Sequence, residues 1–389
     1  MSPEWIWMAF IFAFGACVGS FLNVVVYRLP RDKSLVWPGS ACPSCGKAIQ
    51  FYDNIPIFSW LILGARCRYC KTTISVRYVL IELFTACLFL GVYLWFFFFE
   101  GRQMGFSGDM AIQRFFSGGW IVYLCIMTLL AAFVAASAID LELWIIPLGL
   151  CWFVTAVGVV ASTAAGWVIS PSSIDLYRLF PMASVKQAAI AGGALVGLVI
   201  SLACLRMGWI KPSYPYPQGH EKLSEDKDSP EPEFNDRMEM LKELLFLLPI
   251  VLGGTIGLLL LRGEGVWNFF EKSLELYAIK GFTGSIFGYF VGCAVVWLTR
   301  ILGTLAFGRE AMGLGDVHLM GAAGAVIGPG MVILAFFLAP FFGLILALYQ
   351  WIFKNSRQIP YGPFLSTAVF AVIIFNDTIR NYVMTMYGL

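Results

Sequence analysis

Long runs of apolar residues make up most of the chain and are separated by shorter polar segments. A helix needs about 20 apolar residues to cross the hydrocarbon core of a bilayer. A shorter run, 319–328, is ambiguous, because apolar segments of this length are often re-entrant or tucked into a bundle. The pattern predicts an all-α integral membrane protein, a polytopic bundle of about 8–10 transmembrane helices. The spans expected by this rule are 5–26, 78–99, 119–139, 144–165, 187–207, 244–262, 282–302, 330–352 and 361–377.

Composition supports this class. The 389 residues are 59% hydrophobic and 13% charged, whereas soluble domains have about 45–50% apolar and about 25% charged residues. The chain is therefore expected to have membrane lipid around it, and nothing in it resembles a nucleic-acid-binding domain. The first apolar run carries Glu4 instead of a basic segment and has no small-residue cleavage site, so we expect no cleavable signal peptide.

The distribution of basic residues predicts the orientation. The segment 27–77 holds eight of the 26 basic residues, and its only acidic residues are Asp32 and Asp53. Loops rich in Lys and Arg face the cytoplasm, which places the N-terminus outside. Alternating spans then put Asp140 and Asp316 at the cytoplasmic side. The basic residues of the segment are Arg28, Arg31, Lys33, Lys47, Arg66, Arg68, Lys71 and Arg77.

Four cysteines in the same segment form two C-x-x-C pairs, Cys42 with Cys45 and Cys67 with Cys70, with 21 residues between the pairs. This arrangement is typical of a structural zinc site with four thiolate ligands. Two disulfides are the alternative, but a reducing cytoplasm argues against them. A loop of about 50 residues buries little core, so bound metal would supply folding energy.

Two aspartates lie at predicted helix mouths on the cytoplasmic side, Asp140 in "IDLELWIIP" and Asp316 in "GLGD". Ionisable groups near membrane depth are costly and are usually paired or functional. A carboxylate dyad can hold one shared proton, so that one carboxylate activates water while the other polarises a carbonyl. Gly313 and Gly315 would let the backbone approach a partner closely. The alternative is that each Asp merely caps a helix.

Other residues offer less chemistry. Glu142 is a competing carboxylate beside Asp140. The two histidines, His220 and His318, belong to no Ser-His-Asp or HExxH arrangement, so serine and zinc proteolysis find little support. We expect His318 to be a polar residue at a helix mouth.

Two further segments have a distinctive composition. The segment 208–243 carries five basic and nine acidic residues and several prolines, which predicts a disordered acidic linker. The segments 191–208 and 284–303 share an apolar pattern with regularly spaced glycines. Two explanations remain open: an internal duplication, or small residues that let membrane helices approach closely.

With these motifs in hand, the chain resembles the bacterial prepilin peptidases, or type IV leader peptidases, a family of GxGD aspartic proteases. The resemblance covers two blocks, about 1–165 and about 282–377. The first block contains the four-cysteine loop, "GSFLNVVVYRLP" (19–30), "DNIP" (53–56), "ISVRY" (74–78), Glu82 and "IDLELWIIP" (139–147). The second contains "GLGDVHLM" (313–320), the Gly-rich short helix after it, and "IPYGPFL" (359–365).

The resemblance implies an aspartic endopeptidase of the bacterial inner membrane, with a cytoplasmic active site formed by Asp140 and Asp316. Its substrates would be type IV prepilins or type II secretion pseudopilins, from which it removes a short basic leader. Many members then methylate the new N-terminus with S-adenosylmethionine. The family's zinc ligands fall on Cys42, Cys45, Cys67 and Cys70. The alternatives are a peptidase without methyltransferase activity and a non-enzymatic membrane scaffold or transporter.

The resemblance also implies four regions. Residues 1–77 hold the first span and the four-cysteine loop, which is associated with methylation. Residues 78–165 hold the first catalytic Asp, and 281–389 hold the GLGD motif. Residues 166–280 are an insertion of two spans and the linker.

Three single residues depart from the family pattern. His318 stands where Lys is usual, which would leave a basic group only partly charged near neutral pH. Leu148 stands where Asp or Asn is common. Ala65 replaces a favoured Gly, and this puts methylation in question.

Overall fold

The computed structural model describes residues 4–213, 236–353 and 360–387. Throughout this part of the chain the secondary structure is helical, apart from isolated bridges in the cysteine loop. The chain divides into two compact units, Met1–Glu142 with Ile374–Leu389, and Leu143–Ile373. Each unit is described by itself.

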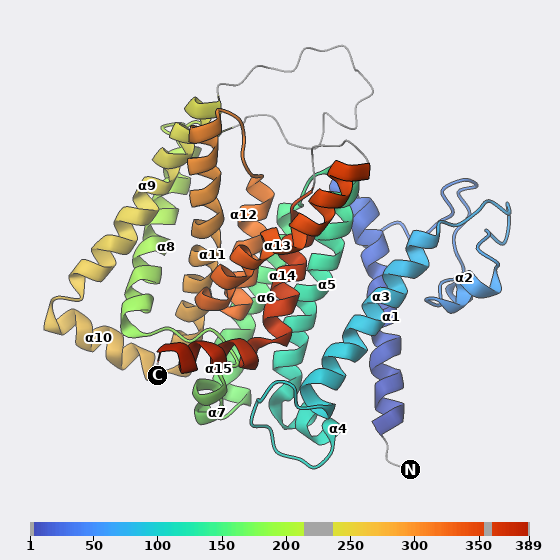
Figure 1. Ribbon diagram of the computed structural model, residues 1–389, viewed down its shortest axis with the longest axis horizontal. Helices are drawn as coiled ribbons and strands as arrows, with labels where there is room; N and C mark the ends of the chain where they lie inside the picture. The colour runs from blue at the N-terminus through green and yellow to red at the C-terminus, as the bar shows by residue number, and fades with distance from the viewer. Residues whose placement is uncertain (1–3, 214–235, 354–359, 388–389) are drawn as a thin grey trace. The chain divides into compact units, whose positions relative to one another are not determined.

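The first unit contains three long helices and the cysteine loop. The helices α1 and α3 pack against each other along their length (Figure 1), and the loop connects them. The elements are α1 (Glu4–Arg28), η1 (Leu29–Arg31), η2 (Phe51–Asp53), α2 (Phe58–Ile62), α3 (Val76–Tyr93), η3 (Leu94–Phe98), α4 (Ala111–Arg114), η4 (Phe115–Gly119), α5 (Trp120–Leu143) and α15 (Asn376–Tyr387).

The second unit is organised around α11, which contacts α6, α8, α12 and α13. The helices α8 and α9 form an antiparallel pair beside it, as Figure 1 shows. The elements are α6 (Leu148–Val168), α7 (Pro171–Tyr177), α8 (Val185–Arg206), α9 (Asp236–Leu260), α10 (Glu264–Leu274), α11 (Tyr277–Phe307), α12 (Leu314–Ile327), α13 (Pro329–Phe353) and α14 (Gly362–Ile374).

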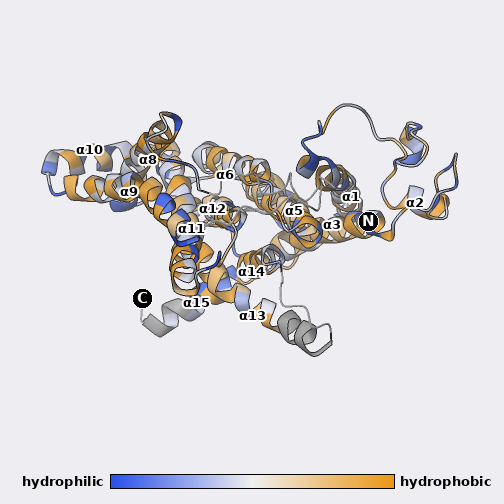
Figure 2. Ribbon diagram, turned by 90° about the horizontal axis from the view of Figure 1, so that it is seen from above, coloured by the Kyte–Doolittle hydropathy of each residue, from blue (hydrophilic) through white to orange (hydrophobic). Residues whose placement is uncertain are grey.

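The predicted membrane class is confirmed. Among the described residues, 7 helices are long and apolar enough to cross a membrane, or up to 8 if α14 and α15 form one bent span. Hydrophobic residues cover the long helices on most sides, and hydrophilic ones are concentrated in loops and at helix ends (Figure 2). A helix occupies each of the predicted spans, and the short run after GLGD forms α12.

One boundary differs from the prediction. The helix α9 begins at Asp236, whereas the acidic linker was expected to continue to residue 243. The sequence "DRMEMLKELL" is charged, yet it is rich in good helix formers and continues directly into the apolar run. Residues 214–235, the rest of that predicted linker, lie outside the described residues, and so does His220.

Small residues bring several helices of the second unit into backbone contact. A side chain at Gly288 of α11 would collide with the carbonyl of Gly324 of α12, and one at Gly193 of α8 would collide with Gly253 of α9. Several of the spaced glycines in 191–208 and 284–303 therefore allow the close approach of neighbouring segments.

We expect Gly288→Ala to destabilise the protein by about 1–3 kcal/mol, because the added methyl group has no room. The matched change Gly192→Ala, at an exposed helix position with open space around it, should instead be stabilising by about 0.5–1 kcal/mol. Thermal unfolding of the purified chain in detergent measures both. Equal shifts for the two variants would contradict this account of the interface.

Candidate functional site

Asp316 lies in the first turn of α12, directly after the Gly-Leu-Gly turn. Its side chain is buried, with 8% of its surface exposed. Gly313 is the N-cap residue and has an extended backbone. The amino end of a helix carries a partial positive charge that favours a carboxylate. This position can therefore hold an ionised Asp in an otherwise apolar setting.

The glycines of GLGD allow close contacts at two sides. A Cβ at Gly315 would lie 2.7 Å from Cβ and 3.4 Å from the carbonyl oxygen of Ile146, so Gly315 admits the segment before α6 rather than a partner helix. A Cβ at Gly313 would lie 3.4 Å from Oδ2 of Asp316 itself. Gly313 thus leaves free the space beside the carboxylate.

Tyr361 lies within electrostatic reach of Asp316, which the sequence reasoning missed. Tyr361 is half-buried, and its phenol interacts electrostatically with the Asp316 carboxyl group. Tyr361 belongs to "IPYGPFL", a motif that carries the resemblance to the family, and this was the available signal that it lies near the site. The hydroxyl group of a tyrosine can donate a hydrogen bond, so Tyr361 is a candidate donor near this site.

His318 occupies a different environment from the one expected at a helix mouth. Its Nδ1 lies 2.9 Å from the hydroxyl of Tyr289 on α11, and its ring lies 6.4 Å from that of Trp152 on α6. The side chain is therefore held between α11 and α6, within the helix packing of the second unit.

Asp140 lies in the last turn of α5 and is also buried, with 6% of its surface exposed. The competing carboxylate, Glu142, forms an ion pair with Arg77 of the "ISVRY" motif on α3. That pairing gives Glu142 a structural partner. Asp140 belongs to the first unit and Asp316 to the second, so the pairing of the two carboxylates stays a prediction.

The four predicted metal ligands come together in the first unit. The sulfur atoms of Cys42, Cys45, Cys67 and Cys70 all lie within 4.8 Å of one another, and Sγ of Cys42 is 3.8 Å from Sγ of Cys70. Zinc with tetrahedral Zn–S bonds of about 2.3 Å would separate its sulfurs by about 3.8 Å. Each of the ten cysteines, all within the described residues, is a free thiol. The donor set therefore fits one closed tetrahedral metal site.

The two C-x-x-C pairs have the same backbone structure. In the first, the N–H of Cys42 donates to the carbonyl of Lys47, at 3.0 Å, and a bridge joins Ala41 to Ala48. In the second, the N–H of Cys67 donates to the carbonyl of Thr72, at 2.9 Å, and a bridge joins Arg66 to Thr73. Each turn points two thiols to one side, as a metal knuckle requires.

Backbone amides also lower the pKa of two of the cysteine thiols. The N–H groups of Cys45 and Ser44 donate to the Cys42 sulfur and lower its pKa to about 6. In the second knuckle, the N–H groups of Cys70 and Tyr69 lower the pKa of Cys67. The thiolate is the form that binds metal, so the fold favours the ligand state of Cys42 and Cys67. Burial and the neighbouring thiols raise the pKa of Cys70 to about 11, so this ligand stays protonated at neutral pH until a metal binds.

Motif residues tie this loop together and to α3. Arg68 donates two hydrogen bonds to Asp53 of "DNIP", at 2.7 and 2.5 Å, and these bonds lower the pKa of the Asp53 carboxyl. Since that pKa is lower in the folded state, the pairing stabilises the loop at neutral pH and is lost on acidification. On α3, the buried carboxylate of Glu82 accepts the N–H of Ile57 at 2.7 Å.

Comparison with known families matches two segments of the chain. Residues 13–96 match the bacterial peptidase A24 N-terminal domain, and residues 249–348 match the type IV leader peptidase family. The first match contains the cysteine loop, and the second contains Asp316. Asp140 lies outside both. The second match begins within α9, inside the segment expected to be inserted.

Curated relatives carry matching names. A "Prepilin leader peptidase/N-methyltransferase" of Myxococcus xanthus is 37% identical over 205 residues, which cover 51% of this chain and 48% of that protein. The chain thus spans about half the length of this relative. A protein of the same name from Aeromonas hydrophila is 24% identical over 412 residues, covering 98% of this chain and 96% of the relative. No solved structure matches the chain.

Proposed function

Because this chain belongs to the type IV leader peptidase family, we propose that it is a prepilin leader peptidase and N-methyltransferase. It is a polytopic membrane aspartic endopeptidase that removes the basic leader of type IV prepilins or pseudopilins. The reaction takes place at the cytoplasmic face of the bacterial inner membrane. The observation that carries this proposal is the buried Asp316 at the start of α12, within the segment matched by the peptidase family.

In the proposed reaction Asp140 and Asp316 share one proton. The ionised carboxylate takes a proton from water, which attacks the carbonyl carbon of the leader junction. The protonated carboxyl donates a hydrogen bond to the carbonyl oxygen and stabilises the developing negative charge. The proton then passes to the leaving amine as the C–N bond breaks. Burial of both side chains excludes bulk water and strengthens these interactions.

Chain connectivity supports the pairing of the two aspartates. The backbone at Gly315 approaches Ile146, and Ile146 follows Asp140 by only six positions. A six-residue extended chain spans at most about 20 Å. A short stretch of chain therefore leads from Asp140 to Ile146, which contacts the helical turn that carries Asp316.

The cysteine loop would bind one structural zinc ion through Cys42, Cys45, Cys67 and Cys70. Zinc bound to four thiolates has no open coordination position, so its contribution is to folding of the loop. Methylation would require S-adenosylmethionine. Ala65, which stands where the family favours Gly, has a left-handed backbone with φ of 57°. Glycine adopts this conformation without strain, which accounts for the preference.

Coexpression with a prepilin tests the proposal. We expect the mature, shortened pilin to accumulate, and mass spectrometry of its N-terminus to show one added methyl group. Cleavage without the methyl group would favour a peptidase that lacks the second activity. An unprocessed precursor, with the chain present in the membrane, would favour the scaffold or transporter alternative and contradict the proposed function.

A further inference from the structure

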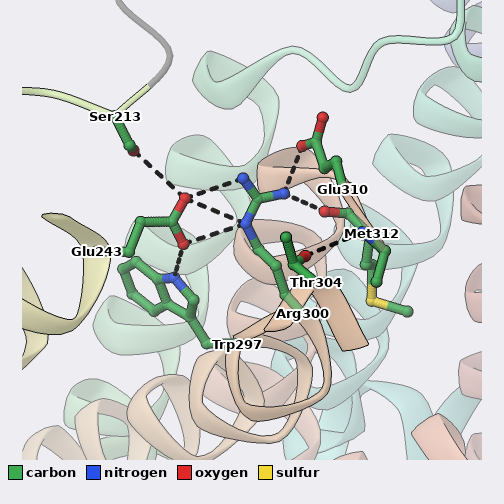
Figure 3. Close-up of polar contacts among 8 residues, drawn as sticks. Ser213, Glu243, Trp297, Arg300, Thr304, Glu310 and Met312 are labelled. Carbon is green, nitrogen blue, oxygen red and sulfur yellow. Dashed lines mark hydrogen bonds and ion pairs between the residues drawn. The ribbon is translucent and has the colours of Figure 1, made fainter. Parts of the chain in front are cut away.

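A buried arginine connects three segments of the second unit. Arg300 lies on α11 with 1% of its side chain exposed, and Glu243 of α9 faces it with 3% exposed. The Nη2 group of Arg300 donates to Glu243 at 2.9 Å, and Nε donates to the same carboxylate at 3.1 Å. Figure 3 shows the guanidinium between Glu243 on one side and Glu310 and Met312 on the other.

The carboxylate of Glu243 is fully used in this arrangement. Besides Arg300, it accepts the indole N–H of Trp297 at 2.7 Å and the hydroxyl of Ser213 at 3.3 Å. A buried guanidinium needs such a compensating charge with good hydrogen-bond geometry. The helix α9 supplies it, and α9 reaches this point only because it begins at Asp236.

The other side of the guanidinium holds the loop that leads into α12. Nη1 of Arg300 donates to Glu310 at 2.5 Å and also to the backbone carbonyl of Met312. A third bond, from the N–H of Ala311 to the hydroxyl of Thr304 on α11, is 3.1 Å long. Met312 immediately precedes the N-cap of α12, so these bonds fix the start of the helix that carries Asp316.

We infer that Glu243 and Arg300 are positioning residues for Asp316: α9 orients the guanidinium, and the guanidinium holds the loop 308–313 in place. The inference rests on the proposed catalytic role of Asp316. Glu243 lies outside both segments that match the family, whereas Arg300 and Glu310 lie inside the second. The chain thus uses a residue on the first turns of α9, just before the matched segment begins, to set the geometry of the peptidase motif.

Kinetics in membranes with a purified prepilin test this role. We expect Glu243→Gln to lower kcat by about 10²-fold, the effect of a shift of about 1 Å at a catalytic group, with KM nearly unchanged. Glu239→Gln is the matched control, because Glu239 is buried one turn earlier on α9 and pairs with Lys242. It should keep the wild-type kcat. Equal losses in both variants would overturn the inference.

The double variant Glu243→Gln/Arg300→Gln separates positioning from simple charge burial. It leaves no unpaired buried charge, so thermal stability should recover relative to Glu243→Gln. Because the guanidinium that binds Glu310 and Met312 is gone, kcat should stay low. If kcat recovers together with stability, Glu243 and Arg300 only neutralise each other's buried charge, and the proposed positioning role is wrong.

A proteolysis readout works without any activity. Arg309 is an exposed trypsin site inside the held loop. We expect cleavage after Arg309 to become faster in Glu243→Gln than in wild type or Glu239→Gln, and to vanish when Arg309→Gln is added. We call Glu243, Arg300 and the loop 308–313 that they hold the Arg300 clamp. If the wild-type chain does not process prepilin but Glu243→Gln still speeds cleavage after Arg309, the proposed function fails while the Arg300 clamp is supported. If trypsin cleaves after Arg309 at the same rate in Glu243→Gln and in wild type, the inference that Glu243 and Arg300 hold this loop is wrong.

Discussion

Replacing Asp316 with Asn should abolish prepilin cleavage while the protein remains in the membrane. Asn has nearly the same shape but cannot exchange a proton, and positioned acid–base groups contribute about 10²–10⁴-fold each. Asp140→Asn should have an equal effect, because each carboxylate depends on the other. The measurement is the fraction of a coexpressed prepilin that is shortened, read on a gel.

Asp175→Asn is a suitable control for both variants. Asp175 lies on α7, where it binds Tyr277 and Lys280, and the proposed reaction does not use it. This variant should process prepilin like the wild type. Complete processing by either Asp140→Asn or Asp316→Asn would remove that residue from the proposed dyad.

The second large effect concerns the metal. Cys42→Ser with Cys45→Ser should reduce the zinc content from one ion per chain to none, since two ligands of a four-thiolate site are lost. Structural zinc sites of this kind supply about 10–16 kcal/mol of binding free energy, which is also folding free energy. We therefore expect the loop to become sensitive to protease. Elemental analysis and limited trypsin digestion measure the two effects.

Cys17→Ser with Cys87→Ser is the matched control, because these two cysteines lie singly on α1 and α3. Both the zinc content and the protease resistance of the loop should be unchanged in it. A purified wild-type chain without zinc would rule out the site, whatever the variants do.

Much of the fold was predictable because the hydrocarbon core of a membrane imposes a fixed length on apolar segments. The start of α9 was not, since its first turns are charged and resemble the linker before them. The cysteine site was also predictable, because its ligands are close in sequence and its spacing is set by metal geometry. The bonds of Glu82 and Asp53, which anchor that loop, required the structure.

The clamp around Arg300 illustrates what the sequence conceals. Glu243 and Arg300 are far apart in sequence, and Glu243 falls in a segment that reads as linker. A signal was nevertheless present, because Arg300 lies inside the predicted span 282–302, and an ionisable residue within an apolar run usually has a partner. Tyr361 was missed for a related reason, because its approach to Asp316 depends on how α12 and the segment before α14 pack.

The clamp also has a consequence for how the protein is made. An arginine in the centre of a membrane helix opposes insertion by about 2.5–3.5 kcal/mol. Arg300, however, lies near the end of α11, whose 31 residues rise about 46 Å, well beyond a hydrocarbon core of about 30 Å. Glu243 precedes Arg300 in the chain and leaves the ribosome first, so this counter-ion is available when the arginine reaches the membrane. Synthesis thus supplies the buried counter-ion Glu243 before the arginine, and Glu310 and Met312 follow it.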